Sequence, residues 1–341
     1  MDTILFLAHT EADGSLPKAA YEALAAAQQL SADLGGAPLV AGLVGADVAS
    51  AANTLGVDKV LGVSGDDFGV SRYGTDVAAA AALVEKAGAT IVVAPATPRF
   101  GRALPGAAAR LDGRIESKIT GLSVDGDAVQ CERWYYRQRI VATLGRKQRP
   151  WFLLTSPGAF EAAPAAQDSA QVEAVTPDLP AAPRTQVTGI ESAGVETKTI
   201  RPDAEVLFVA GAGWNKKQKD GETRVKDAER LVLGFLDQAQ ASLGSTKSLV
   251  DQGAEGEEVM SFLSHLNQVG QTGSTPRHKK GLATCCHGEE PHTVGWRFIN
   301  ERRAINLDEN CSWAQGKADV LYVADSFEVM EKVNALLAAD A

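Results

Sequence analysis

The chain has 341 residues, of which 45% are apolar and 22% charged, and its formal net charge is −10. This composition is typical of a globular protein long enough for two domains, and it excludes disordered and fibrous chains. The excess of acidic residues, with no basic stripe, argues against nucleic acid as a partner. No run approaches the ~20 apolar residues that span a bilayer, and the first residues do not form a secretory signal. We therefore expect a cytoplasmic protein without a transmembrane segment, and four cysteines without disulfide spacing fit a reducing compartment.

The first part of the chain, residues 1–155, alternates short β-rich apolar runs with alanine-rich helical stretches. Residues 4–8 and residues 91–94, for example, are each followed by such a stretch. This alternation predicts a mostly parallel sheet covered by helices on both faces. After residue 119 the pattern changes to short strands, which predict an antiparallel addition formed by residues 128–131, 139–144 and 151–155.

The second part of the chain repeats this α/β alternation after a different segment. Residues 161–200 are rich in Ala, Pro, Gln and Ser without a sustained period, which is typical of a linker. Strands are then predicted at residues 206–209, 247–250, 304–306 and 320–323, and helices at 224–241 and 327–337. The predicted fold class is α/β with two domains. They are an N-terminal nucleotide-binding-like domain with a mostly parallel sheet, residues 1–160, and a C-terminal Rossmann-like domain, residues 201–341.

The most informative motif is Gln268-Val269-Gly270-Gln271-Thr272-Gly273. Its two glycines let the backbone approach a ligand closely, and Gln271 and Thr272 supply short polar groups for a planar heterocycle. The same residue types are common in ordinary surface turns, so the six residues alone leave both interpretations open. Other polar and glycine positions surround the motif at orderly intervals: Asp251, Gly253, Gly288, His292, Asn306 and Asp308.

Two other motifs carry weaker signals. Cys285, Cys286, His287, His292 and Cys311 could form a metal cluster, but adjacent ligands fit a tetrahedral zinc site poorly, and no metal site is predicted. Gly211-Ala212-Gly213 lacks the third glycine of a dinucleotide-binding turn. The lysine-rich residues 216–219 that follow suggest a solvated loop or a partner contact.

In their order, the motifs of the second half resemble the alpha subunit of the electron-transfer flavoproteins. That family has G-A-S-R-x-x-V-D-x-G, then Q-V-G-Q-T-G, G-I-S-G-x-I-Q-H, A-I-N-x-D and A-D-x-x-x-V-x-D-x-F. This chain has G-S-T-K-S-L-V-D-Q-G at residues 244–253 and all six residues of the second motif. It also has A-I-N-L-D at 304–308 and A-D-V-L-Y-V-A-D-S-F at 318–327.

The resemblance implies that the C-terminal domain binds FAD. The Thr272 hydroxyl and nearby amides would meet the redox-active edge of the flavin ring and stabilise its added electron density. Lys247 replaces the family's arginine, so it keeps the charge but loses the planar fork. His292 would meet the pyrimidine side of the ring, and Asn306 and Asp325 would contact the ribityl and adenosine parts. The implied cofactor-binding residues are Lys247, Gln268, Val269, Gly270, Gln271, Thr272, Gly273, Gly288, His292, Asn306 and Asp325.

The chain also departs from the family pattern. Where the family has G-I-S-G-x-I-Q-H, residues 285–292 read C-C-H-G-E-E-P-H, which introduces Pro291, a residue without a backbone N–H, and two carboxylates. The turn that contains Ala212 lacks the arginine of the family's G-G-R-G. Either the phosphates are held differently here or flavin affinity is reduced.

The implied function is that of an electron carrier without catalytic residues. It would be the alpha half of a heterodimer whose beta subunit contacts the N-terminal domain. Electrons would pass from a flavin-dependent dehydrogenase, with enzymes of methylated amines as candidates, to a quinone-linked oxidoreductase. The departures leave an alternative open, a binding or assembly module that keeps the fold without FAD. An NAD-dependent oxidoreductase is poorly supported, because no acid/base pair accompanies the glycines.

Overall fold

The computed structural model forms two compact units, Met1–Glu191 and Ser192–Ala341. It describes residues 2–136, 140–167, 169–179, 185–190, 200–201, 204–254, 258–269, 275, 277–285, 299–307 and 318–340. Both units are α/β and each is built on a sheet of largely parallel strands, so the predicted fold class is confirmed. Among the described residues, no helix is long and apolar enough to cross a membrane.

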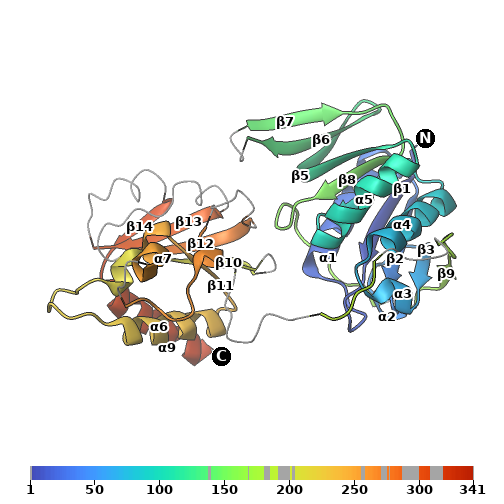
Figure 1. Ribbon diagram of the computed structural model, residues 1–341. Coiled ribbons are helices and arrows are strands. Elements are labelled where there is room, and N and C mark those ends of the chain that lie inside the picture. The colour runs from blue at the N-terminus through green and yellow to red at the C-terminus, as the bar shows by residue number, and fades with distance from the viewer. Residues whose placement is uncertain are drawn as a thin grey trace. The chain divides into compact units, whose positions relative to one another are not determined.

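The first unit contains a nine-stranded sheet, sheet A, with the order β7-β6-β5-β8-β4-β1-β2-β3-β9 (Figure 1). Its central strands are buried along nearly their whole length, as expected for parallel strands covered on both faces. The strands are β1 (Ile4–His9), β2 (Leu39–Gly45), β3 (Val60–Ser64), β4 (Ile91–Pro95), β5 (Arg114–Asp125), β6 (Ala128–Tyr135), β7 (Ile140–Gly145), β8 (Trp151–Thr155) and β9 (Val172–Ala174).

Alternate residues of the central strands face two separate cores. In β1, Ile4 and Phe6 pack with helix α1, whereas Leu5 and Leu7 pack with α4 and α5. This two-residue alternation follows from the strand geometry, which points successive side chains to opposite faces. The helices of this unit are α1 (Lys18–Asp33), α2 (Ala49–Ala52), α3 (Asp66–Gly69), α4 (Tyr73–Ala87) and α5 (Pro98–Arg110).

The predicted antiparallel addition is correct for β6 and β7 and wrong for β8. The β5–β6 and β6–β7 pairs are antiparallel, but β8 lies between β4 and β5 and is parallel to both. The segment predicted as a linker also contributes to the first unit. Strand β9 pairs in parallel with β3, and Ala163 and Ala170 pack against the core.

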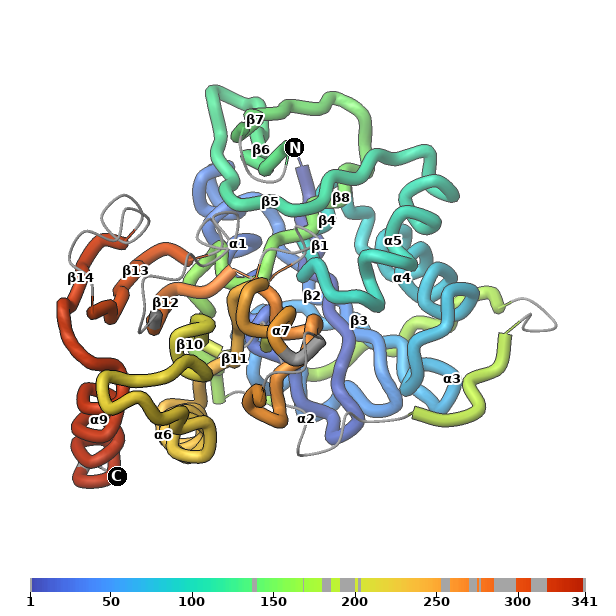
Figure 2. The backbone as a smooth tube through the Cα atoms, turned by 60° about the vertical axis from the view of Figure 1, so that its left-hand side comes forward, coloured from blue at the N-terminus to red at the C-terminus, as the bar shows by residue number. Residues whose placement is uncertain are grey.

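The second unit contains a five-stranded parallel sheet, sheet B, with the order β11-β10-β12-β13-β14. Figure 2 shows α6 and α9 running side by side at this sheet, and they contact one another closely through Asn334, whose side chain donates to the carbonyl of Leu231 over 2.9 Å. The elements are β10 (Val206–Ala210), η1 (Ala212–Asn215), α6 (Val225–Gln238), β11 (Ser242–Ser245), α7 (Lys247–Ala254), η2 (His265–Asn267), β12 (His278–Cys285), β13 (Ile299–Asn306), β14 (Val320–Val323) and α9 (Ser326–Asp340).

The strand predicted at residues 247–250 is instead the first turn of α7, and the strand lies just before it, in β11. The Thr246 hydroxyl accepts a hydrogen bond from the amide of Leu249 over 3.3 Å, which is the bond of a helix N-cap. This cap explains why an apolar pair, Leu249 and Val250, belongs to a helix here.

Candidate functional site

The carboxyl ends of the five strands of sheet B meet at one edge, because all five run in parallel. The chain leaves β10 toward β11 on one side, and β12 pairs with the other side of β10. Such a reversal of strand order opens a crevice at the carboxyl edge, where open α/β sheets bind their ligands. Ala210 is in register with both Ser245 and Thr284, so these strand ends are level.

The turn after β10 is fixed against the neighbouring strand. The amide of Gly211 donates to the carbonyl of Thr284 over 2.8 Å, and Trp214 Nε1 donates to Thr284 Oγ1 over 2.7 Å. The Trp214 ring is fully buried and meets the edge of Phe327, with 4.6 Å between ring centroids. The turn therefore holds a defined position at the carboxyl edge.

Lys247 begins α7 directly after β11, at the same edge. Its Nζ lies 3.0 Å from Asp251 Oδ2, one helical turn later, and its side chain is 61% exposed. The positive charge expected near the flavin is thus shared with a carboxylate of the same helix. Lys247 lies at the carboxyl edge of sheet B, and Asp251 offsets part of its positive charge.

The first residues of the Q-V-G-Q-T-G motif reach this edge through an isolated parallel bridge. Gln268 pairs with Ser245, and the amide of Val269 donates to the carbonyl of Ser245 over 3.1 Å. Gly244 makes the approach possible, because a Cβ at that position would lie 2.4 Å from Val269 Cγ2. In the sequence, Gly244 beside Ser245 looks like part of a flexible turn. In the structure, the packing of Val269 requires a glycine at this position.

Asn306 and Asp325 lie at the carboxyl ends of β13 and β14, on the other side of β10 from β11. Asn306 ends β13 and is fully buried, and its carbonyl accepts from the amide of Ala324 over 3.1 Å. Asp325 Oδ1 accepts from the amide of Phe327 over 2.8 Å, so Asp325 caps the N-terminus of α9. Its role in starting this helix is established by that bond.

The structure thus brings five predicted site residues to one sheet edge: Lys247, Gln268, Val269, Asn306 and Asp325. The others lie outside the described residues: Gly270, Gln271, Thr272, Gly273, Gly288 and His292. Three residues weighed for a metal site, Cys286, His287 and Cys311, lie outside them as well. Within the described part of the chain, no group of three potential metal ligands comes together.

Three buried polar atoms at this end of the second unit were missed by sequence reasoning. Asn215 Oδ1, Ser245 Oγ and Ser326 Oγ have no hydrogen-bond partner among the described residues. Asn215 lies in the turn after β10, Ser245 ends β11, and Ser326 begins α9 shortly after β14. A buried polar atom without a partner costs about 1–3 kcal/mol, so the set fits a ligand rich in hydroxyl, amide and phosphate groups. FAD is such a ligand.

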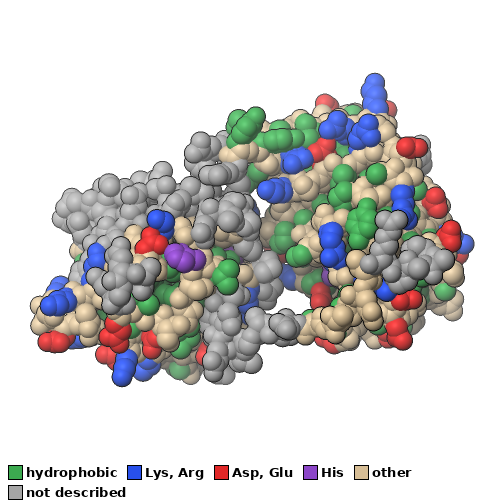
Figure 3. All heavy atoms as spheres, in the orientation of Figure 1, with side chains coloured by type: hydrophobic (Ala, Val, Ile, Leu, Met, Phe, Trp, Pro, Cys, Tyr) green, Lys and Arg blue, Asp and Glu red, His purple; other side chains and the backbone are tan. Residues whose placement is uncertain are grey.

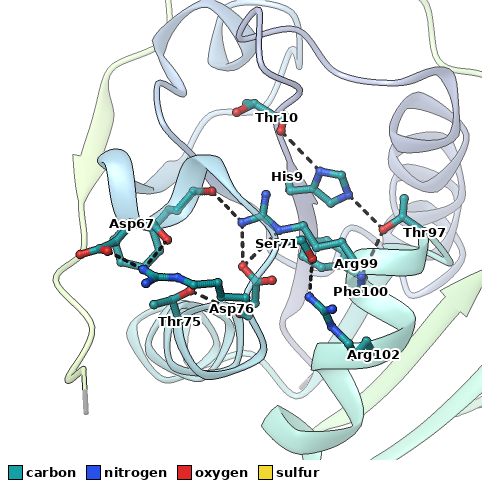
Figure 4. Close-up of polar contacts among 12 residues, drawn as sticks. His9, Thr10, Asp67, Ser71, Thr75, Asp76, Thr97, Arg99, Phe100 and Arg102 are labelled. Atoms are coloured by element: carbon teal, nitrogen blue, oxygen red, sulfur yellow. Dashed lines mark hydrogen bonds and ion pairs between the residues drawn. The ribbon is translucent and has the colours of Figure 1, made fainter. Parts of the chain in front are cut away.

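The carboxyl edge of sheet A is built differently (Figure 4). His9 Nε2 lies 3.0 Å from Thr97 Oγ1, and Arg99 Nη2 lies 2.6 Å from the buried Asp76 Oδ1. Burial and the neighbouring Arg99 lower the pKa of His9 from 6.5 to about 4. Most polar groups here are satisfied by one another, and Asp76 Oδ2 and Arg72 Nε are the exceptions among the described residues of this cluster. On the face shown in Figure 3, acidic and basic side chains are interspersed over both units.

Comparison with known proteins adds a consistent set of similarities. A profile described as "Electron transfer flavoprotein domain" matches residues 4–180 of this chain. The chain is 30% identical over 232 residues to a protein named "Probable electron transfer flavoprotein subunit alpha, mitochondrial" from Schizosaccharomyces pombe. That alignment covers 67% of this chain and 61% of the yeast protein, which is about three fifths of its length.

Two bacterial proteins named "Electron transfer flavoprotein subunit alpha" align over nearly their full length. The chain is 27% identical over 332 residues to the one from Mycobacterium leprae, covering 96% of this chain and 95% of that protein. It is 28% identical over 340 residues to the one from Clostridium acetobutylicum, covering 96% of this chain and 94% of that protein.

Proposed function

Because the chain belongs to the electron transfer flavoprotein family and resembles its alpha subunits, we propose that it binds FAD at the carboxyl edge of sheet B and carries electrons. The observation that carries the proposal is the gathering of five of the eleven motif-derived residues at one edge of the second unit, the carboxyl edge of sheet B. The buried polar atoms at this end of the unit that have no partner among the described residues support it further.

Different residues would contact different parts of the cofactor. Lys247 and the start of the Q-V-G-Q-T-G motif, at Gln268 and Val269, lie beside β11, and we assign the flavin ring to that side. Asn306 and Asp325 lie at β13 and β14, and we assign them to the ribityl and adenosine parts. Gly270, Gln271, Thr272, Gly273, Gly288 and His292 complete the proposed set. Bound FAD supplies the electron chemistry, whereas the chain's own residues bind, orient and tune it.

The Lys247–Asp251 ion pair bears on how the flavin is tuned. A lone ammonium beside the ring would favour the reduced, negatively charged cofactor. Asp251 Oδ2, 3.0 Å from that ammonium, offsets part of this effect. We therefore expect hydrogen-bond donors of the 270–273 segment to contribute more to the reduction potential than Lys247 does.

In this proposal the chain is one half of a heterodimer. A beta subunit contacts the first unit, a flavin-dependent dehydrogenase delivers electrons, and a quinone-linked oxidoreductase accepts them. A dehydrogenase of methylated amines is the donor that we would test first. The chain itself makes and breaks no covalent bond in a substrate.

The proposal is tested by mixing the complex with candidate donors. The chain is co-expressed with its beta subunit, purified, and mixed without oxygen with a flavin-dependent dehydrogenase and its substrate. Bleaching of the flavin absorption band only when substrate and dehydrogenase are both present is the expected result. A complex that carries FAD but is reduced by no dehydrogenase tested, including those of methylated amines, would remove the carrier role.

The second candidate is a binding module that keeps the fold without FAD. It is favoured by one specific observation, that the turn containing the buried Ala212 has no arginine to face a phosphate. A well-folded complex that takes up no FAD at any concentration would establish it.

A further inference from the structure

Trp214 connects three parts of the second unit. Its indole belongs to η1, directly after β10, and is 0% exposed. Nε1, the only hydrogen-bond donor of the ring, donates to Thr284 Oγ1 near the end of β12 over 2.7 Å. The ring also meets Phe327, in the first turn of α9, with 4.6 Å between ring centroids. One side chain therefore links the carboxyl ends of β10 and β12 to the start of α9.

The hydroxyl of Thr284 is used both as an acceptor and as a donor. It accepts from Trp214 and donates to the carbonyl of Val209 over 3.3 Å. The carbonyl of Thr284 accepts from the amide of Gly211 over 2.8 Å. Thr284 is buried, and a hydrogen bond lost away from water leaves its partner unsatisfied at a high cost. The end of β12 is thus fixed to the turn after β10 as well as to the strand itself.

Both residues that Trp214 contacts lead to parts of the proposed flavin site. Thr284 is followed in the sequence by residues 285–292, which contain two of the residues proposed to bind FAD. The amide of Phe327 donates to Asp325 Oδ1 over 2.8 Å. Because Trp214 has no exposed surface, it can act on a bound cofactor only through these neighbours.

The first unit contains a fully buried tryptophan that offers a comparison. Trp151 begins β8, and its Nε1 has no hydrogen-bond partner among the described residues. Its indole fills volume in the core, whereas the indole of Trp214 also carries a hydrogen bond between two elements. A phenylalanine at either position keeps an aromatic ring in the core, but only at position 214 does it remove a hydrogen bond that the structure describes.

We propose that Trp214 is a positioning residue of the flavin site. Its hydrogen bond to Thr284 and its ring contact with Phe327 hold the end of β12 and the start of α9 where the residues that follow Thr284 and the carboxylate of Asp325 can bind the cofactor. A binding site is precise when the groups that meet the ligand are themselves held by packed, hydrogen-bonded neighbours. This inference rests on the proposed FAD function and adds a residue outside the eleven proposed to contact FAD.

The test compares two tryptophan variants of the purified heterodimer after its flavin is removed. FAD is titrated into wild type, Trp214→Phe and the matched control Trp151→Phe, and quenching of flavin fluorescence gives each Kd without electron transfer. Urea unfolding is measured on the same samples. Both variants should lose stability, because each shrinks a fully buried ring. Only Trp214→Phe should raise the Kd for FAD, by about tenfold, the effect of one lost hydrogen bond.

Variants of Thr284 separate the hydrogen bond from packing. Thr284→Val keeps the shape of the side chain and removes the hydroxyl, so it should raise the Kd for FAD as Trp214→Phe does. Thr284→Ser keeps the hydroxyl and loses a methyl group, so it should bind FAD like wild type although it is less stable. Trp214→Phe/Thr284→Val should raise the Kd no more than Thr284→Val alone, since the two residues share one bond.

A Kd for FAD in Trp214→Phe equal to that in Trp151→Phe overturns the proposal, as does a Thr284→Ser variant that loses as much affinity as Thr284→Val. If Trp214→Phe does not fold, the comparison of the two Thr284 variants decides the question. If wild type itself takes up no FAD, the proposed function fails and this inference fails with it. FAD binding in wild type with unchanged affinity in every variant overturns the inference alone.

Discussion

At the carboxyl edge of sheet A, most polar side chains from different elements bond to one another, although Asp76 Oδ2 and Arg72 Nε have no partner among the described residues. His9 contacts Thr97, and Arg99 contacts Asp76. At the carboxyl edge of sheet B, buried polar atoms of Asn215, Ser245 and Ser326 have no partner among the described residues. Both edges lie where a parallel sheet reverses its strand order, since β1 lies between β4 and β2 just as β10 lies between β12 and β11. The reversal of strand order is common to both edges. They differ in how many of their polar groups are hydrogen-bonded to other side chains.

The two edges differ in what they offer to a ligand. Where side chains hydrogen-bond to one another, those bonds stabilise the fold and few polar groups remain for a ligand. Where buried polar atoms lack hydrogen bonds, the folded protein is less stable, and a ligand that supplies those bonds can restore the stability. The following predictions test whether the first edge is structural and the second a binding site.

The largest effect is expected from Arg99→Met in the first unit. The substitution leaves the fully buried Asp76 carboxylate without its cation, which costs about 3–5 kcal/mol of unfolding free energy. Urea unfolding measures it. Arg102→Met is the control, because Arg102 is exposed and contacts only Ser71 Oγ among the bonds seen here. Equal losses in both variants would show that the buried pair is not what closes this edge.

The second largest effect is the loss of stability at acidic pH that His9 causes. Its folded-state pKa of about 4 lies below the ordinary 6.5, so the neutral ring is favoured by folding. The stabilisation is fully present above pH 6.5 and is lost as pH falls toward 4, by roughly 3 kcal/mol in total. His9→Gln should lack this component. We expect the difference in unfolding free energy between the two proteins to narrow across this window, and a constant difference would contradict the assignment.

A smaller effect is expected from Gly244→Ala in the second unit. The new methyl group would lie 2.4 Å from Val269 Cγ2, so the start of the Q-V-G-Q-T-G motif must move. Overpacking of this kind costs about 1–3 kcal/mol, and FAD affinity should fall with it. Gly74→Ala is the matched control, since nothing lies within 4 Å of its added Cβ. Thermal unfolding and FAD titration of both variants are the measurements.

The smallest effect on stability is expected from the exposed Lys247–Asp251 pair. Removing either partner should change the unfolding free energy by less than about 0.5 kcal/mol. The flavin should respond in opposite directions, because Lys247→Gln removes positive charge and lowers the reduction potential, whereas Asp251→Asn raises it. Potentials that shift the same way in both variants would place the pair away from the ring.

Much of the architecture could be predicted from periodicity. Alternating apolar runs and alanine-rich stretches gave both sheets and most helices, because parallel strands are buried on both faces. Strand β8 follows two short strands in the sequence, and this position favours the antiparallel addition. Its own composition, Trp151-Phe152-Leu153-Leu154, is the continuous apolar run of a central parallel strand, so the signal was present.

Other features could not be predicted from the spacing of apolar residues along the sequence. Strand β9 has three residues within a Pro- and Ala-rich segment, too few to show alternation. Lys247 and Asp251 have the four-residue spacing of a helical ion pair, but the strand that the sequence predicts at residues 247–250 gives no reason to expect that pair. The unpartnered Asn215 oxygen depends on packing between η1 and α7, elements that are distant in sequence. No pattern along the chain reports that a buried atom lacks a partner.

The flavin content of the purified heterodimer, in wild type and in altered forms, tests most directly whether FAD binds at the carboxyl edge of sheet B. Asn306→Ala changes a fully buried residue at the proposed site, whereas Arg102→Met changes an exposed residue of the other unit. Visible absorption and released FAD should show about one FAD per complex in wild type and in Arg102→Met, and a clear loss in folded Asn306→Ala. Equal FAD in all three, or none in wild type, would contradict a flavin site at the carboxyl edge of sheet B.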